Sequence, residues 1–295
     1  MSRLRLIAYI AVAMVIGACS STTATETAPQ TNNTSNTENS SNADTTGLAA
    51  SVNGVGITIE NYNTELTRRS SVGVADTNAL SEQVLTELIE QELINQGAPA
   101  LGITITDADV DTEIAEQRDI AGSDQAWRDS LAMNGYTEDQ WYAAQRNVLI
   151  TLGVRNVLLE PYLGEVEQVN ARHILVRTED EANEVLDRLE SGTDGFATLA
   201  AEYSLDVTTA DVGGNLGWFA RNELFYRSLE DSAFTLEIGS VSYVSTPLGY
   251  HVLEPLAREI RVIEPSRLTT LSENVFNRWL DEQYQSATVE VYIQW

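Results

Sequence analysis

The glycine-rich stretch Gly213-Gly214-Asn215-Leu216-Gly217-Trp218-Phe219 is the most informative part of this 295-residue chain. Paired glycines predict a tight turn, and the apolar residues after them predict a strand. On both sides of this stretch, segments in which apolar and polar residues alternate, as in strands, are interspersed with segments whose apolar residues have helical spacing. The further strands and helices are predicted at residues 169–176, 178–189, 196–203, 229–234, 241–245 and 250–253. A strand, helices and then several strands predict a small α+β domain over residues 166–257.

The sequence on either side of this domain has helical character. Within residues 48–164, Asn53-Gly54 predicts a short hairpin, and capping boxes predict helix starts at Thr106 and Thr137. The tail, residues 258–295, contains one amphipathic helix and a strand-like end. Because a single helix cannot form a core, we expect the tail to pack back on residues 48–164. The α+β domain is therefore predicted to be an insertion in a mostly helical domain.

The N-terminal residues resemble the signal segment of an exported lipoprotein. Basic residues precede thirteen apolar residues at 6–18, too few to span about 30 Å of hydrocarbon, so residues 1–18 predict a cleaved signal peptide. The run ends at Cys19, the only cysteine, in a setting similar to a bacterial lipobox, which predicts lipidation of Cys19. The alternative is an ordinary signal peptide with an incidental cysteine. The Ser/Thr/Asn-rich remainder of residues 19–47 predicts a disordered tether.

The composition argues against several classes of function. The chain has 44 acidic and 17 basic residues, all 17 of them arginine, for a formal charge of −27. Such a charge does not favour binding to nucleic acid or to anionic lipid headgroups. One cysteine and two histidines are too few for a zinc cage, and no hydrolase or nucleotide-binding motif is present, so we expect no metal and no cofactor.

Four motifs in residues 166–257 together resemble the parvulin family of peptidyl-prolyl cis–trans isomerases. They are Ala171-Arg172-His173-Ile174-Leu175-Val176, Tyr203-Ser204-Leu205-Asp206, the glycine-rich stretch, and Thr246-Pro247-Leu248-Gly249-Tyr250-His251. Their order and spacing follow the family's pattern. The resemblance implies an antiparallel sheet with surrounding helices and an isomerase activity.

The resemblance also implies roles for individual residues. His173, Asp206, His251 and Thr246 match the catalytic hydrogen-bond network. Leu216, Phe225, Leu229 and Phe234 match the apolar pocket that receives the proline ring. Asn215 stands where the family usually has aspartate, and we expect only a local effect on the turn.

The chemistry of the reaction is consistent with such a site. Rotation about an X-Pro bond must cross about 18–20 kcal/mol because amide resonance is lost. A dry pocket with fixed donors lowers this barrier without a nucleophile, metal or cofactor. The alternative is that the network only holds the sheet together.

The helical flanks resemble the chaperone module of SurA- and PrsA-type extracytoplasmic foldases. This resemblance implies a foldase whose partners are unfolded or nascent secreted polypeptides with X-Pro bonds. Together with the predicted lipidation of Cys19, it predicts a foldase held by a lipid anchor on a bacterial membrane. The alternative is an ATP-independent holdase with a catalytically weak parvulin domain. An isomerase acts at substoichiometric amounts, whereas a holdase acts only near equimolar amounts.

Overall fold

The computed structural model describes residues 46–70 and 77–294. The predicted signal segment, Cys19 and nearly all of the predicted tether lie outside the described residues. The described chain forms a helical module (residues 46–70, 77–164 and 263–294) and an inserted domain (residues 165–262). Within this part of the chain, no helix combines the length and apolar character needed to cross a membrane.

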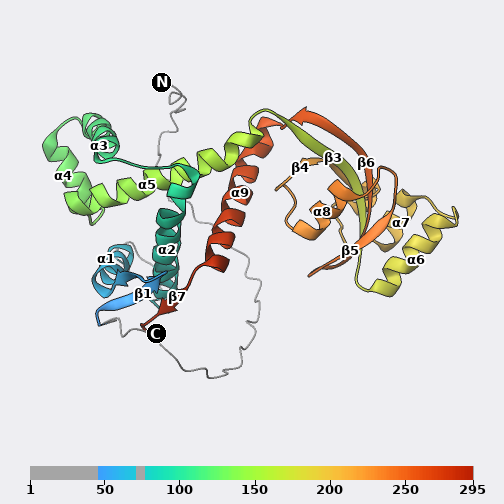
Figure 1. The fold of residues 1–295 in the computed structure, drawn as a ribbon, viewed down its shortest axis with the longest axis horizontal. Helices are drawn as coiled ribbons and strands as arrows, with labels where there is room; N and C mark the ends of the chain where they lie inside the picture. The colour runs from blue at the N-terminus through green and yellow to red at the C-terminus, as the bar shows by residue number, and fades with distance from the viewer. Residues whose placement is uncertain (1–45, 71–76, 295) are drawn as a thin grey trace. The chain divides into compact units, whose positions relative to one another are not determined.

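A small antiparallel sheet joins the two ends of the helical module. Strands β1 (Leu48–Val52) and β2 (Val55–Thr58) form the predicted hairpin, in which Asn53 and Gly54 both have positive φ. Strand β7 (Val289–Val291) pairs with the other edge of β1, as Figure 1 shows near the C-terminus. The tail therefore returns to the first helical segment, as the sequence predicts.

Six α-helices and two short 3-10 helices complete the described helical module. Their bounds are α1 Ile59–Ser70, α2 Thr77–Gly97, η1 Ala98–Leu101, α3 Asp107–Ala121, α4 Asp124–Met133, α5 Glu138–Leu159, η2 Glu160–Tyr162 and α9 Pro265–Ser286. The predicted capping boxes at Thr106 and Thr137 are both present. Phe276 and Leu280 of α9 are buried in the same core as Leu93 of α2. The C-terminal helix thus completes the core of the helical module.

The inserted domain is built on a four-stranded antiparallel sheet in the order β4-β3-β6-β5. Its strands are β3 Glu165–Val176, β4 Asn215–Ala220, β5 Ser242–Thr246 and β6 Gly249–Val262. Strand β6 pairs with β3 as far as Val262, so the sheet continues beyond residue 257, the end expected from the sequence. Pro255 lies next to an irregularity in this pairing, where a missing N–H is tolerated.

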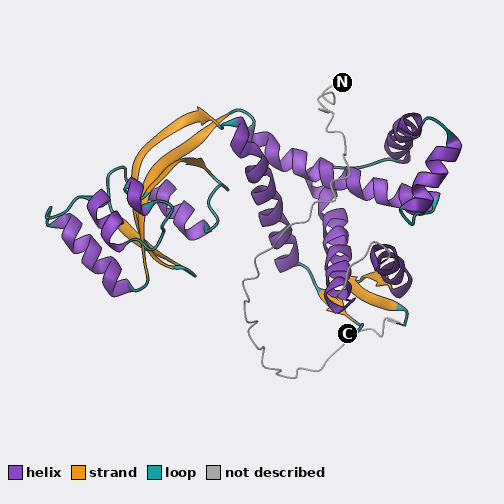
Figure 2. Ribbon diagram, turned by 180° about the vertical axis from the view of Figure 1, so that it is seen from behind, coloured by secondary structure: helices purple, strands orange, loops and turns teal. Residues whose placement is uncertain are grey.

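Helices cover both faces of this sheet (Figure 2). Helices α6 (Glu179–Glu190) and α7 (Phe196–Tyr203) pack on Ile174 and Val252, whereas α8 (Arg227–Thr235) packs on Ala171 and Leu253. The 3-10 helix η3 (Ala210–Val212) follows α7. Since side chains alternate along a strand, residues 173 and 251 lie on the α8 side of the sheet.

Candidate active site

Two buried histidines meet on neighbouring strands of the inserted domain. His173 of β3 pairs with Leu253 of β6, and His251 pairs with Leu175, so the two histidines are diagonal neighbours on one face. Their Nδ1 atoms are 3.0 Å apart, and the rings stack at a centroid distance of 5.2 Å with an interplanar angle of 18°. The side chains are only 4% and 2% exposed. The sheet register therefore holds both rings in one geometry.

Asp206 extends the pair at the His173 end. Its Oδ2 atom lies 2.8 Å from Nε2 of His173, and the loop that carries it is fixed to β3 by the Leu205 amide, which donates to the Leu175 carbonyl at 2.7 Å. Thr208 donates to Oδ1 through its backbone N–H and its hydroxyl, and the Thr209 hydroxyl donates to Oδ2 at 2.7 Å. The carboxylate is thus surrounded by donors.

Thr246 closes the other end of the arrangement. Its hydroxyl oxygen lies 2.8 Å from Nε2 of His251 and accepts the Leu248 N–H at 3.2 Å. Asp206, His173, His251 and Thr246 therefore form one continuous hydrogen-bonded line, here called the polar row. All four residues were candidates from the sequence, and the structure brings them together.

The electrostatics favour an ionised Asp206 carboxylate and a neutral His251 imidazole. Partial burial alone would raise the pKa of Asp206, but hydrogen bonds from Thr208, Thr209 and His173 outweigh it and hold this pKa well below its usual range. Burial, together with the neighbouring His173, lowers the pKa of His251 to about 4. One order of donors gives every member of the row a partner. Thr246 donates to His251, His251 donates to His173, and His173 donates to Asp206.

The glycine-rich stretch approaches the polar row through its backbone. The His173 N–H donates to the Gly214 carbonyl at 2.8 Å, and a Cβ added at Gly214 would lie 2.1 Å from the His173 carbonyl oxygen. Gly214 also has a φ of +76°, which favours glycine. Asn215 accepts the Gly217 N–H at 2.9 Å through Oδ1. An aspartate can accept this bond equally well, which agrees with a local role for the residue.

The four apolar candidates occupy different environments. Leu229 and Phe234 of α8 are buried against the sheet, and Leu216 packs at the edge of the same cluster. Phe225 is 86% exposed and contacts Tyr226 edge to face at 4.9 Å. The structure therefore does not bring Phe225 into the cluster that holds the other three.

Sequence reasoning missed Tyr226, Thr208 and Thr209. The Tyr226 ring lies 6.3 Å from the His251 ring, whereas the Phe225 ring contacts Tyr226. For the two threonines a signal was available, because hydroxyl residues just after an aspartate commonly close an Asx turn on its side chain. No comparable local signal exists for Tyr226, whose neighbour in space is distant in sequence.

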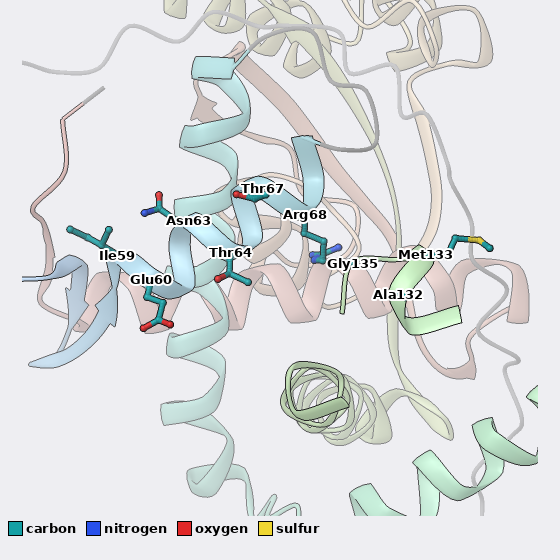
Figure 3. Close-up of a pocket in the computed structure, with 9 residues that line it drawn as sticks. All are labelled: Ile59, Glu60, Asn63, Thr64, Thr67, Arg68, Ala132, Met133 and Gly135. Carbon is teal, nitrogen blue, oxygen red and sulfur yellow. The ribbon is translucent and has the colours of Figure 1, made fainter. Parts of the chain in front are cut away.

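The helical module contains a groove of about 960 Å³ between α1 and the end of α4. Figure 3 shows its lining, which comprises Ile59, Glu60, Asn63, Thr64, Thr67, Arg68, Ala132, Met133 and Gly135. None of the predicted site residues lies there. Among the residues that the structure describes, no cluster of three or more His, Cys, Asp or Glu side chains is arranged to hold a metal ion.

Two families of known proteins match the chain. The PPIC-type PPIase domain matches residues 159–258, and the SurA-like N-terminal domain matches residues 6–155. The first match contains the whole polar row. The second extends over half of the chain.

Several relatives and solved structures are similar to this chain. The foldase protein PrsA of Caldanaerobacter subterraneus is 28% identical over 245 residues, covering 78% of this chain and 77% of that protein. The foldase protein PrsA of Halalkalibacterium halodurans is 34% identical over 189 residues, covering 58% of this chain and 56% of that protein. The solved structure of PrsA from Bacillus anthracis covers 68% of this chain and 94% of its own, with 24% identity and a TM-score of 0.45. From the two family matches, the chain belongs to the SurA-like family and carries a PPIC-type, parvulin peptidyl-prolyl cis–trans isomerase domain.

Proposed function

We propose that this protein is a foldase for exported polypeptides and that it rotates their X-Pro bonds above the polar row. The main support for catalysis at this place is a continuous line of hydrogen bonds on one face of the sheet, formed by Asp206, His173, His251 and Thr246. The parvulin domain and the named PrsA relatives support the foldase assignment.

The polar row supports catalysis through fixed dipoles. The planar amide ground state is charge-separated, and the twisted transition state is less so. A surface with little water and oriented hydrogen bonds therefore stabilises the twisted state relative to the planar one. An acceleration to ordinary turnover requires a barrier reduction of only about 3–6 kcal/mol. No covalent bond forms or breaks in this mechanism.

Leu216, Leu229 and Phe234 stay in the proposal as residues that support the apolar side of the proline pocket. Leu229 and Phe234 are buried, so they act by shaping the wall beneath the ligand. Phe225 is so exposed that it can contact a bound peptide only from the rim. Tyr226 joins the proposal because its ring faces His251.

The test is catalysed cis–trans exchange of a short X-Pro peptide, measured by NMR with the chain lacking its signal segment. Asp206→Ala removes the acceptor that orders the row and should lower the exchange rate about tenfold to a hundredfold. Asp211→Ala is the matched control, since Asp211 is an exposed carboxylate in the same domain. Equal rates for Asp206→Ala and the parent would contradict the assignment of the row.

The alternative is a holdase without useful catalysis, for which the groove between α1 and α4 is the relevant feature. Refolding of a proline-limited client separates the two functions. An isomerase accelerates refolding when it is far below the client concentration. Suppression of aggregation that requires equimolar protein, with no acceleration, would favour the holdase.

We also propose that residues 1–18 are removed and that Cys19 carries the lipid that anchors the protein outside the cytoplasm. The support is the short apolar run and the position of the single cysteine. Two or more acyl chains would hold the protein stably, since each buried CH₂ contributes about 0.8 kcal/mol. Cys19→Ser should move the protein from the membrane fraction to the soluble fraction. Retention in the membrane fraction would contradict the anchor.

A further inference from the structure

The loop between β4 and α8 carries two neighbouring aromatic residues, and one of them lies close to the polar row. This entry loop, residues 221–226, ends at Tyr226, whose ring lies 6.3 Å from that of His251. Phe225 stands beside Tyr226 and is exposed. The loop contains Asn222, a non-glycine residue with a φ of +70°. Asparagine adopts this left-handed conformation more readily than most residues, and contacts with the surroundings hold the loop in it.

Helix α9 of the helical module supplies that support through Arg278. The Arg278 guanidinium donates to Asn222 Oδ1 at 2.9 Å and to Glu230 Oε1 at 3.3 Å, and its other terminal nitrogen donates to the Leu224 carbonyl. One guanidinium therefore holds three points around the entry loop. A planar fork with several donors suits this arrangement, whereas a single ammonium group does not.

The contact is buried. The side chains of Arg278 and Glu230 are 14% and 4% exposed. Glu230 also accepts the Leu224 N–H through Oε2 at 3.2 Å, so both backbone polar groups of Leu224 are held by this ion pair. Asn274, one turn earlier on α9, donates to the Asn222 carbonyl at 3.0 Å. A buried, multiply bonded pair holds its geometry more firmly than an exposed pair does.

Helix α9 also belongs to two apolar clusters. Phe276 and Leu280 pack in the core of the helical module, while Leu271 and Val275 pack in a cluster that includes Ala220, the last residue of β4. The entry loop begins at the next residue. Helix α9 thus completes the core of the helical module and also packs beside the start of the entry loop of the inserted domain.

We propose that Arg278 is a positioning residue for the isomerase site, through which helix α9 sets the entry loop and hence Tyr226 and Phe225 at the rim of the proline pocket. The inference rests on the proposed function of the inserted domain. Arg278 does not reach the polar row, so it acts on capture of the peptide and leaves the rotation step unchanged.

The test measures kcat and KM separately for an X-Pro peptide, using the chain without its signal segment. Arg278→Met should raise KM about tenfold, because a misplaced loop weakens binding, while kcat stays within about twofold. Arg278→Lys keeps the charge beside Glu230 and should retain more stability than Arg278→Met while still raising KM. If Arg278→Met does not fold, the KM of Arg278→Lys is the quantity that tests the inference. Exchange of the Leu224 amide hydrogen should be faster in both variants.

The matched control is Glu282→Gln, which breaks another ion pair between the same two helices. Arg227 of α8 and Glu282 of α9 are 2.8 Å apart, but both side chains are more than half exposed. This variant should leave KM and Leu224 exchange unchanged. An unaltered KM in folded Arg278→Lys, or an equal rise in Glu282→Gln, would overturn the inference. Absence of catalysis in the parent chain would instead refute the proposed function.

Discussion

The polar row of the inserted domain and the groove of the helical module differ in how far their side chains are buried. The row holds two imidazoles that are 4% and 2% exposed, each hydrogen-bonded at both ring nitrogens. The groove is lined by groups such as Met133, which is 86% exposed. Stabilising a twisted amide requires dipoles that are fixed before the ligand arrives, whereas receiving a flexible chain does not. Burial of polar groups therefore separates the row, which we propose to be catalytic, from the exposed groove.

The largest expected effect concerns the backbone under the row. Gly214→Ala would force a Cβ to 2.1 Å from the His173 carbonyl oxygen, so the free energy of unfolding of the inserted domain should fall by more than about 3 kcal/mol. Gly192→Ala is the control. It has a similar positive φ of +68° with open space around it, and should cost about 1 kcal/mol. Urea unfolding measures both, and equal losses would show that no close approach exists at Gly214.

The second effect is a pH dependence that comes from His251. Its pKa is lowered from 6.5 to about 4 in the folded protein, so between these values the unfolded chain binds a proton that the folded chain does not. The free energy of unfolding should therefore fall as the pH is lowered from about 7 to about 4, by roughly 3 kcal/mol at most. His251→Gln should show a flatter profile in this window. If the two profiles are parallel, His251 is not held neutral by its surroundings.

The smallest effect is expected in the groove. Met133→Ser changes an exposed side chain, so the free energy of unfolding should change by less than about 0.5 kcal/mol and the exchange rate on an X-Pro peptide should stay the same. Thermal unfolding and NMR exchange check the two quantities. A clear loss of isomerase rate in this variant would contradict the separate roles of the polar row and the groove.

Local patterns were sufficient to predict much of the fold. The capping boxes at Thr106 and Thr137 and the hairpin at Asn53-Gly54 depend on residues within four positions of one another, and all are present. The end of β6 was not predicted, because Pro255 is a usual strand-ending signal. Here the proline sits beside an irregularity of the sheet, and its carbonyl accepts the Gly239 N–H at 2.8 Å.

The residues of the candidate site also fall into two groups, those that the sequence predicted and those that only the structure reveals. The family pattern gave His173, Asp206, His251 and Thr246, and these are the residues that the structure joins by hydrogen bonds. Phe225 was assigned from apolar spacing that resembles the family's pocket, and such spacing says nothing about the direction of a side chain in an irregular loop. Tyr226 and Arg278 act through neighbours distant in the sequence, so only the tertiary structure reveals them.

The pairing of β1 with β7 has a consequence for the order of folding during synthesis. Residues 50–52 can pair with residues 289–291 only after the latter are synthesised, more than two hundred residues later. The inserted domain lies wholly between these strands and closes its own sheet from residues 165–262. The ribosome therefore delivers the complete inserted domain before the sheet of the surrounding module can be completed by β7, and loss of the last few residues would leave an edge of β1 unpaired.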